Sequence, residues 1–592
     1  MAKKKRKQKK SRIFWDIETN PFSEFEASEM FMKCVVFVTE GSDTPHVCLS
    51  EKEVLQYIIE FAGCVFIAHN GGKFDNVWLI NLIQRDGRKA SISCAMQGSR
   101  ILYMDVMIDG ESSRFLDSFA IFPTSLDKIA KSFGMEGKKY PEKYLFIVNG
   151  WSCLVPSEQA YEHKVSFLRH ATIEEIVAYC IEDTLMLKRS FLMFERTMLE
   201  QFNVEPSITS AATAYKVFCE NYKWHPLYCR DVWNENIRKY GYFGGRVELF
   251  RKGIIEEKIS VFDVNSLYPY CMLGDVPFGT PRIITGKEKN KVVDTDFYYV
   301  EVTVTNDAGV LPFYHEKHKK LFFPKGTFWG YYTGLDLKML DWTGGSYKID
   351  CRIAFRAKPL FKEYVKTIYA KRQIAKETGD TGFDLTLKLL LNSLYGKFGM
   401  KRERTQLLLS NEVAQEDLES GVWVPTSHGW HLCPQVTDVG FADQSVATSA
   451  YITSKARSVL LTAIVNNYER AVYCDTDSLH IIGGKEDFYG CVDQTKLGAW
   501  KYEGTFDRGI YHAPKVYKLE GHETKKAHKG FSRFPEQLQD QQEKPSVDPL
   551  KTMLKKGVFG SSIISKSLLA KTEKRRYDGA FSYPLDIEDL DG

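Results

Sequence analysis

The sequence predicts a multidomain α/β protein, and three observations support this fold class. The chain has 592 residues, which at about 150 residues per domain corresponds to about three to five domains. Its composition, 44% hydrophobic and 26% charged, is that of a folded globular protein rather than of a disordered or collagen-like chain. Short apolar runs at 12–15 and 64–68 are typical of buried strands, whereas apolar residues recur at helical spacing over 173–194.

Several broad classes of protein are excluded by composition. No apolar run approaches about 18 residues, and no apolar stretch follows the basic N-terminus, so we expect neither a membrane span nor a secretory signal. The 13 cysteines include no C-x-x-C pair, which argues against a disulfide framework or a zinc knuckle and fits a reducing cytosol. Because no G-x(4)-G-K-[ST] phosphate loop is present, ATP hydrolysis is not expected.

Residues 1–10 form a basic arm that is too highly charged to fold by itself, and we expect it to be disordered. The net charge of +4 is too small to indicate a nucleic-acid partner. Two interpretations of the arm stay open, a solvated tail and a phosphate-binding segment. The same run would also serve as a nuclear import signal.

A first set of acidic residues indicates a metal-dependent nuclease near the N-terminus. Asp16 and Glu18 lie two residues apart in a predicted strand, so both carboxylates are on one face. Asp75 adds a third acid from a loop, and Asp183 adds a fourth from a helix that carries Tyr179 one turn earlier. Alone, a D-x-E pair is more often a solvated strand end. Together, four acids suit two-metal phosphodiester hydrolysis, with Tyr179 orienting the attacking water.

A second set of acidic residues indicates another metal site. Asp263 lies at the end of a predicted buried strand. Asp475 and Asp477 lie between two apolar half-strands, a pattern that predicts a hairpin with acids at its tip. A buried strand has little structural use for carboxylates unless they are paired or bind a metal ion. We therefore expect Asp263 and Asp477 to be the metal pair and Asp475 to support them.

A helical stripe lies between these acids in the sequence. Lys388, Asn392 and Tyr395 follow at i, i+4 and i+7, so they share one face of a predicted helix. A cation, an amide and an aromatic ring aligned in this way suit a nucleoside triphosphate, with the lysine on the phosphates. A solvated lysine is the default interpretation of such a stripe by itself.

The first acidic set resembles the proofreading domain of family B DNA polymerases. Its motifs D-x-E, N-x(2 or 3)-[FY]-D and Y-x(3)-D occur here in that order. The resemblance implies an RNase H-like 3′-5′ exonuclease domain in which Asp16, Glu18, Asp75 and Asp183 bind metal. It also implies contacts with single-stranded DNA. For that role we expect Asn70, Phe74, Ser118, Phe119 and one lysine, for which Lys138, Lys139 and Lys143 compete and Lys139 is favoured.

The second set is similar to polymerase motifs A, B and C of the same family, D-x-x-S-L-Y-P, K-x(3)-N-S-x-Y-G and Y-x-D-T-D-S. The resemblance implies a right-hand polymerase with palm, fingers and thumb, and two Mg²⁺ ions per active site, with Mn²⁺ as an alternative. Metal ligands are then Asp263, Val264 and Asp477. The nucleotide site comprises Val264, Tyr268, Lys388, Asn392 and Tyr395, with Tyr268 excluding a 2′-hydroxyl group by clash.

Three short elements resemble the primer-template contacts of the family. A Y-x-G-G element, whose other interpretation is an ordinary turn, a T-x-x-[AG]-R element and a K-x-Y element are present. A surface ion pair is the alternative role of Arg457. The expected DNA contacts are Tyr242, Gly244, Gly245, Thr453, Arg457, Lys515 and Tyr517.

Long segments between the motifs leave room for two insertions, as in the protein-primed subgroup of linear-genome phages and linear plasmids. That resemblance implies a terminal protein as primer, strand displacement, primer-template DNA and deoxynucleoside triphosphates as partners, a monomer and the cytoplasm of a bacterial host. The expected domains are the basic arm at 1–10, the exonuclease at 11–203, palm at 204–274 and 446–545, the first insertion (terminal-protein region) at 275–358, fingers at 359–400, the second insertion at 401–445 and the thumb at 546–592.

Local patterns refine this division. We expect the first insertion to be rich in strands, residues 360–394 to form a helical hairpin, and the polar run 534–545 to be a linker.

Three other functions are alternatives to this one. A nuclease alone would leave Asp263, Asp475 and Asp477 unexplained, and a non-enzymatic DNA-binding or packaging protein would leave both acidic sets unexplained. A family B polymerase started by a nucleic-acid primer shares all these motifs, and only the two insertions favour protein priming over it.

Overall fold

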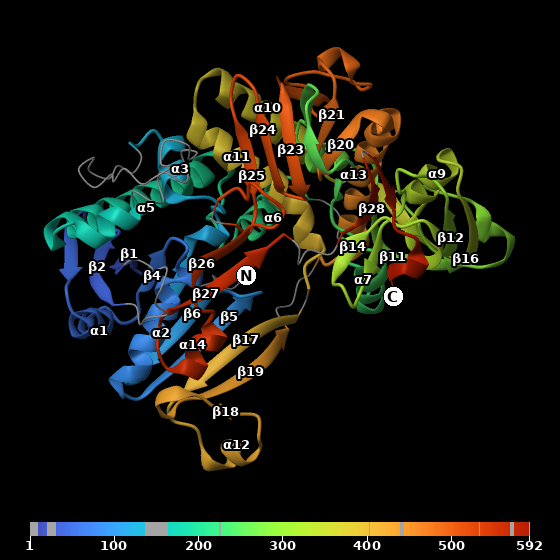
Figure 1. Ribbon diagram of the computed structural model, residues 1–592. Helices are drawn as coiled ribbons and strands as arrows, with labels where there is room; N and C mark the ends of the chain where they lie inside the picture. The colour runs from blue at the N-terminus through green and yellow to red at the C-terminus, as the bar shows by residue number, and fades with distance from the viewer. Residues whose placement is uncertain are drawn as a thin grey trace.

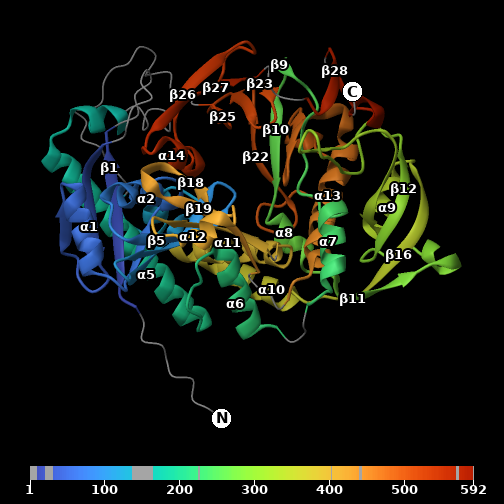
Figure 2. The same ribbon diagram turned by 90° about the horizontal axis from the view of Figure 1, so that it is seen from below.

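The computed structural model describes residues 10–20, 31–136, 164–223, 227–401, 403–438, 443–531, 533–568, 573–579 and 581–590. Residues 1–9 of the basic arm and the candidate Lys139 lie outside the described residues. No described helix is long and apolar enough to cross a membrane. Figures 1 and 2 show an N-terminal domain at one end of the molecule and the first insertion at the other. The central sheet and the helices α10 (Lys362–Glu377) and α11 (Thr381–Phe398) lie between them.

The N-terminal domain is built on a mixed sheet that α5 covers on one face. Strand β1 pairs antiparallel with β2 and parallel with β4, and β4 pairs parallel with β7. The predicted helix at 173–194 is confirmed and continues to Phe202, where Asn203 adopts a left-handed conformation. The elements are β1 (Arg12–Thr19), β2 (Met32–Thr39), β3 (Pro45–Cys48), α1 (Glu51–Glu60), β4 (Val65–Ala68), α2 (Asp75–Asp86), β5 (Ala90–Gln97), β6 (Arg100–Ile108), β7 (Glu111–Asp117), α3 (Leu126–Ser132) and α5 (Ile173–Phe202).

The second insertion extends this sheet instead of forming a separate one. Strand β17 pairs antiparallel with β5 and with β19, so the sheet has ten strands in the order β18-β19-β17-β5-β6-β7-β4-β1-β2-β3. Its polar, poorly periodic sequence hides two long strands because both are largely solvated on their outer faces. The elements are β17 (Glu403–Ser410), α12 (Gln415–Glu419), β18 (Val424–Pro425) and β19 (His431–Asp438).

The central sheet carries the second acidic set. Its strands lie in the order β22-β10-β21-β20-β8, with β10 between β22 and β21. The predicted hairpin is confirmed, since β20 and β21 are joined by Thr476 and Asp477, and Thr476 has a positive φ of 62°. The elements in and around this sheet are α6 (Ser210–Asn221), α7 (Asp231–Tyr240), β8 (Val247–Leu249), β10 (Ile259–Val264), α8 (Leu267–Cys271), α13 (Val446–Asn466), β20 (Ala471–Asp475), β21 (Ser478–Ile482) and β22 (Trp500–Phe506).

The first insertion is rich in strands, and the segment after it forms a helical hairpin, as predicted. A four-stranded antiparallel sheet runs in the order β11-β16-β12-β15. Helices α10 and α11 follow, and the Asp380 side chain caps α11 by accepting from the Phe383 backbone N–H. The elements are β11 (Val276–Ile284), β12 (Phe297–Val304), β13 (Phe313–His315), β14 (Lys320–Phe322), β15 (Gly326–Thr333), α9 (Gly334–Trp342), β16 (Ser346–Lys358), α10 (Lys362–Glu377) and α11 (Thr381–Phe398).

The prediction of a linker at 534–545 is wrong for its second half. Residues 541–547 form strand β26, which pairs with β27, and the expected boundary between 545 and 546 falls inside this strand. Gln, Glu and Lys gave the segment the composition of a loop, although backbone pairing needs no apolar side chains. The remaining elements are β9 (Gly253–Ile255), β23 (Arg508–Ala513), β24 (Val516–Glu520), β25 (Lys525–His528), β26 (Gln541–Val547), α14 (Leu550–Lys556), β27 (Ser561–Ser567), β28 (Arg575–Asp578) and β29 (Phe581–Pro584).

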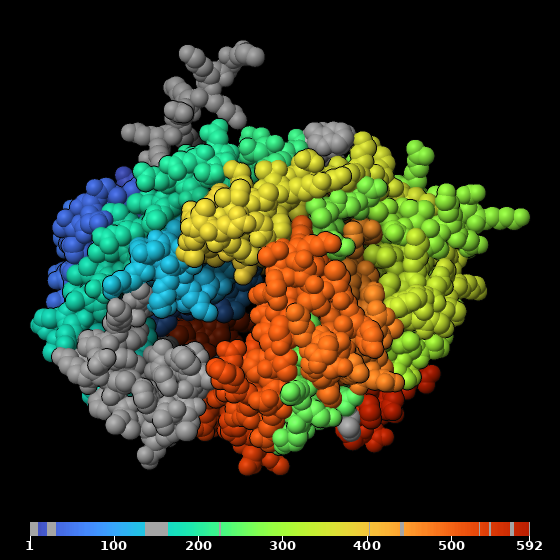
Figure 3. Space-filling view, turned by 90° about the horizontal axis from the view of Figure 1, so that it is seen from above, coloured from blue at the N-terminus to red at the C-terminus, as the bar shows by residue number. Residues whose placement is uncertain are grey.

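Helix α14 joins the C-terminal region to the N-terminal domain. Met553 and Phe559 are buried in the same hydrophobic core as Leu409 and Trp430 of the second insertion and Trp78 of α2. The Gly557 carbonyl accepts hydrogen bonds from Asn81 and His428. Three segments that are distant in sequence therefore share one core. Figure 3 shows a deep hollow between the blue N-terminal domain, the yellow helices α10 and α11, and the orange segments of the central sheet.

Candidate active sites

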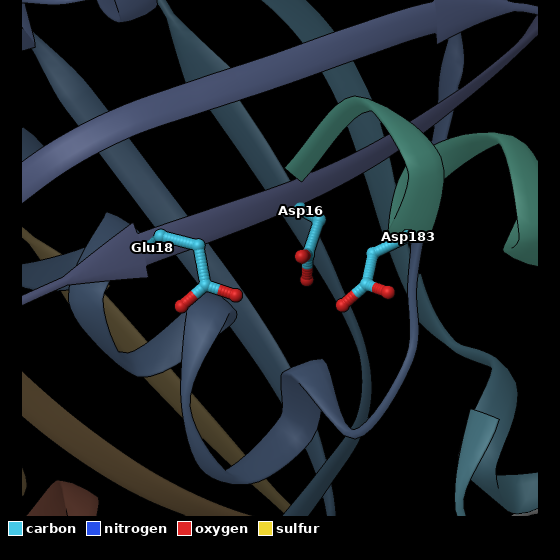
Figure 4. A group of neighbouring side chains, drawn as sticks. All are labelled: Asp16, Glu18 and Asp183. Atoms are coloured by element: carbon cyan, nitrogen blue, oxygen red, sulfur yellow. The ribbon is translucent and has the colours of Figure 1, made fainter. Parts of the chain in front are cut away.

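Three carboxylates of the first acidic set converge on one face of the N-terminal sheet. Asp16 and Glu18 project from the same side of β1, and Asp183 reaches them from α5 (Figure 4). One oxygen of each lies within 4.8 Å of the others. Glu18 and Asp183 are buried. Among the described residues these three side chains form a group of acids close enough together to share a metal ion.

Asp75 lies at the start of α2, outside this group of three. It is 3% exposed, and burial raises the pKa of its carboxyl group to about 8, with further contributions from Asp117 and Glu18. Its Oδ1 atom has no hydrogen-bond donor among the described residues. Tyr179 is also buried, and its ring packs 5.4 Å from that of Phe167.

A lysine that the sequence did not indicate lies at this site. Lys164 Nζ is 3.8 Å from Glu18 Oε1 and lowers the pKa of Asp75. No short motif marks it, and its position depends on the helical segment that precedes α5. Lys139, the predicted candidate, lies outside the described residues, so Lys164 is the described lysine that meets the carboxylates.

Arg100 organises the predicted contacts with single-stranded DNA. Its guanidinium donates to Asn70 Oδ1 at 2.8 Å and to Asp117 Oδ2 at 2.5 Å, and it lies 4.2 Å from the centroid of the Phe119 ring. Ser118 is buried and donates to the Ala68 carbonyl at 3.0 Å, so its hydroxyl supports the loop. Neither Arg100 nor Asp117 was among the predicted residues.

Phe74 also has a structural partner. Its ring meets that of Phe559 at 5.4 Å, edge to face. The side chain predicted to contact DNA thus lies where α2 touches the C-terminal region.

The second acidic set meets at the end of the central sheet. The Val264 N–H donates to the Asp477 carbonyl at 2.7 Å, which ties the end of β10 to the β20–β21 turn. Burial, together with the nearby Asp477 charge, raises the pKa of Asp263 to about 7. Burial likewise raises the pKa of Asp477 to about 6, opposed by Lys515 and Lys388. Val264 has an apolar side chain, so only its backbone carbonyl could serve a metal ion.

Asp475 is engaged differently from its two neighbours. Lys515 Nζ lies 2.6 Å from Asp475 Oδ2, and the Tyr473 hydroxyl donates to the same oxygen at 3.1 Å. The predicted DNA contact Tyr517 packs its ring 5.2 Å from Tyr473. Lys515 therefore neutralises the supporting acid, and the K-x-Y element is joined to the carboxylate site.

The helical stripe of α11 faces this site. Lys388 and Asn392 are exposed, and the Tyr395 ring stacks on Tyr268 with centroids 4.4 Å apart. Arg372 of α10, which the sequence did not single out, donates to the Ser266 hydroxyl at 3.1 Å. The stacked pair forms an aromatic surface beside the carboxylates.

The Y-x-G-G element packs directly against the β20–β21 turn. A Cβ atom on Gly245 would lie 2.8 Å from the Thr476 side chain, so only glycine fits there. Gly244 is exposed and Tyr242 is half-buried.

Two predicted DNA contacts lie inside the protein, which corrects their expected role. Thr453 is 3% and Arg457 5% exposed. Arg457 donates to the carbonyls of Phe243 and Gly244 at 2.7 and 3.2 Å. It supports the Y-x-G-G loop from behind instead of forming the expected surface contact, because its side chain points into the core from α13.

Both acidic sets fit divalent metal ions. In each, buried or half-buried carboxylates that would repel one another lie close together, and Mg²⁺ and Mn²⁺ take oxygen ligands. Asp16, Glu18 and Asp183 would hold metal in the N-terminal domain. Asp263 and Asp477 would do so in the central sheet, where burial disfavours their charged forms until a cation is present.

Comparisons with known proteins agree with the motifs. The family described as DNA polymerase type B, organellar and viral, matches residues 62–481. A probable DNA polymerase of Ascobolus immersus is 26% identical over 500 residues, covering 77% of this chain and 41% of that one. The DNA-directed DNA polymerase of Enterobacteria phage PRD1 is 28% identical over 490 residues, covering 80% and 77%. The chain spans about half the length of its fungal relatives.

The fold agrees with that of a solved structure, Phi29 DNA polymerase complexed with primer-template DNA. The TM-score is 0.70 at 19% identity, with 94% of this chain and 100% of that chain covered. The likeness confirms the predicted fold class, an exonuclease domain with a right-hand polymerase architecture.

The raised pKa of Asp263 predicts a stability change on its neutralisation. The metal-free folded protein keeps a proton on Asp263 that the unfolded chain loses between about pH 4 and pH 7, so the unsubstituted protein loses stability as pH rises through that window. Asp263→Asn should therefore raise the melting temperature at pH 7.5 in chelator, and the gain should vanish near pH 3.5.

Scanning calorimetry across pH would measure this difference. Asp417→Asn, at an exposed position of α12, serves as the control. Excess Mg²⁺ should stabilise the unsubstituted protein more than the Asn variant. Equal melting temperatures for both in chelator at pH 7.5 would contradict the assignment of a destabilising buried charge to Asp263.

Proposed function

The chain belongs to the family of organellar and viral type B DNA polymerases, and we propose that it is a DNA-directed DNA polymerase with 3′-5′ exonuclease activity. One observation carries the proposal. Asp263 and Asp477, from motifs A and C, are brought together at the end of the central sheet, and each is buried enough to raise its pKa above the ordinary range. Such a pair is suited to bind the metal ions that nucleotidyl transfer requires.

The side chains around this pair suit an incoming nucleotide. Lys388 is exposed on α11 and close enough to lower the pKa of Asp477, so its ammonium group is placed to bind phosphate oxygens. The Tyr268–Tyr395 stack offers a flat surface for the sugar and base. Bound Mg²⁺ would supply charge neutralisation for the primer 3′-hydroxyl group and the departing pyrophosphate.

The N-terminal site supports proofreading hydrolysis of a 3′ end. Asp16, Glu18 and Asp183 would hold metal, and buried Tyr179 lies on the same helix as Asp183. Lys164 beside Glu18 is placed to stabilise negative charge that develops on a phosphate. The Arg100 and Phe119 pair offers a cation and a ring to a single strand.

Protein priming and strand displacement are part of the proposal. Support for protein priming comes from the two insertions, whose places between the motifs resemble those of the protein-primed subgroup. The second insertion continues the N-terminal sheet, and α14 packs into the same core. These segments can therefore enclose a DNA strand that passes through the hollow of Figure 3. A polymerase started by a nucleic-acid primer is the alternative. In either case we propose action in the cytoplasm of a bacterial host.

Substitutions should separate the two activities. Asp477→Asn should lower deoxynucleotide incorporation by more than about 100-fold, because it removes charge that a metal ion needs, and should spare degradation of single strands. Asp16→Ala combined with Asp75→Ala should do the reverse. Both rates are read with the same labelled oligonucleotide on a denaturing gel. Normal extension by the Asp477 variant would refute the polymerase site.

Lys164→Ala should lower the exonuclease rate by about 10- to 100-fold, because it removes the cation beside Glu18. Lys131→Ala, which removes a surface ion pair with Asp127 in the same domain, is the matched control and should have little effect. Single-turnover degradation of a 5′-labelled single strand measures the chemical step. An unchanged rate would show that Lys164 takes no part in hydrolysis.

The whole proposal is tested by extension of a primed single-stranded circle with Mg²⁺ and four deoxynucleotides, without accessory proteins. Products many times the circle length are expected, since they require synthesis and strand displacement together. Products that end at one circle length would support polymerase activity and contradict intrinsic strand displacement. Primer shortening alone would assign the protein to the nucleases.

A further inference from the structure

A C-terminal segment returns to the central sheet after the β26–β27 hairpin. We call residues 573–579 and 581–590 the C-terminal clamp. It contains the β28–β29 hairpin and reaches the first insertion, where the Lys325 N–H donates to the Leu585 carbonyl at 3.0 Å and the Ile587 N–H donates to the Lys325 carbonyl at 2.9 Å. The predicted polymerase motifs do not account for this segment.

The clamp covers the open edge of the central sheet. Strand β8 is the last in the sheet order, so alternate backbone carbonyls of β8 face away from β20 and need partners. Lys574 Nζ donates to the Val247 carbonyl at 3.2 Å, and the Tyr577 hydroxyl donates to the Leu249 carbonyl at 2.9 Å. Side chains of the clamp thus take the place of a further strand.

A buried ionic group fixes this contact. Arg575 and Arg246 are each 1% exposed, and both guanidinium groups bind Glu248, which is fully buried. Arg246 Nε donates to Glu248 Oε2 at 3.0 Å, and Arg575 Nη1 lies 3.5 Å from the same oxygen. Two cations share one carboxylate, so removal of a single member leaves buried charge or buried polar atoms uncompensated.

The same two arginines hold the first insertion. Arg575 Nη2 donates to the Asp307 carbonyl at 2.9 Å and to the Tyr468 hydroxyl at 3.1 Å. Arg246 Nη1 donates to the Gly309 carbonyl at 2.8 Å. The clamp, the central sheet and the first insertion therefore meet at one desolvated network.

This network connects to the turn that carries Asp477. Glu248 lies opposite Cys474 in the pairing of β8 with β20. The Thr476 N–H donates to the Arg246 carbonyl at 2.7 Å, and the absence of a side chain at Gly245 lets the chain approach Thr476. The backbone at Gly245 and Arg246 thus packs against the β20–β21 turn and holds it by a hydrogen bond.

We propose that the C-terminal clamp fixes the turn between Asp475 and Asp477, and that Arg575 is a positioning residue for DNA synthesis. Arg575 has no contact with Asp263, Asp475 or Asp477 or with the predicted nucleotide site; its partners are Glu248, Ser582, Tyr468 and backbone carbonyls. It acts by holding Glu248, Arg246 and the first insertion in one arrangement. The catalytic part of this inference rests on the proposed function, whereas its structural part does not.

The test compares Arg575→Ala with Arg576→Ala. Arg576 is the adjacent residue, and its side chain is 63% exposed in a surface ion pair with Asp589, so it is a matched control. Hydrogen exchange read by mass spectrometry follows a peptide spanning 473–478, which reports on the Thr476 N–H. Primer extension and single-strand degradation are measured on the same full-length preparations.

Arg575→Ala should speed exchange in the 473–478 peptide by at least about tenfold and lower synthesis by at least about tenfold. Exchange in β1 and the exonuclease rate should stay within about twofold of their values in the unsubstituted protein, because β1 and the exonuclease site belong to the N-terminal domain. Arg576→Ala should change none of these. Arg575→Lys keeps a positive charge beside Glu248 but lacks the second nitrogen that reaches the Asp307 carbonyl. It should speed exchange in the 473–478 peptide and lower synthesis by about threefold each.

Unchanged exchange at 473–478 in the Arg575 variants would overturn the proposal. Faster exchange throughout the chain, including β1, would also overturn it, since Arg575 would then serve general stability. If Arg575→Ala does not fold, Arg575→Lys decides between these outcomes. If the unsubstituted protein fails to extend a primer, the proposed function fails, while the exchange measurement still decides whether the clamp fixes the turn.

Discussion

Repulsion between Asp263 and Asp477 is the constraint around which the central sheet is built. Burial raises the pKa of both carboxyl groups, so their closeness is unfavourable without a cation. Backbone geometry keeps the two residues close together. The Val264 N–H holds the Asp477 carbonyl, and Thr476 takes a left-handed conformation that a threonine adopts only under such constraint. The free energy of unfolding of the metal-free protein is thus lowered, because the sheet holds two acids where a metal ion would bind.

The parts of this arrangement that depend on short-range spacing could be predicted from the sequence. The i, i+2 spacing of Asp16 and Glu18 put both on one face of β1, and the apolar half-strands around Asp475 predicted the hairpin. The helical hairpin α10–α11 follows from its periodicity and the capping residue Asp380. In each case neighbours in the sequence determine the geometry.

Other features depend on contacts between distant segments and could not be predicted in this way. Lys164 meets Glu18 only because α5 and the segment before it lie on the sheet. Arg457 matched a DNA-binding element, yet its side chain points inward because α13 is buried on nearly every side. Strand β26 forms without an alternating apolar pattern, because its pairing with β27 relies on backbone hydrogen bonds. The motifs predicted which acidic residues come together better than they predicted which side chains face the solvent.

The ten-stranded sheet has a consequence for how the chain is made. Strand β5 completes its hydrogen bonding only with β17, and the Ala90 N–H is paired with Asn411, 321 residues later. While a ribosome synthesises the intervening chain, the edge of β5 stays open for many seconds, at about 5–20 residues per second. An open strand edge can pair with another nascent chain. The order of synthesis therefore exposes this protein to a risk of aggregation that the finished molecule no longer carries.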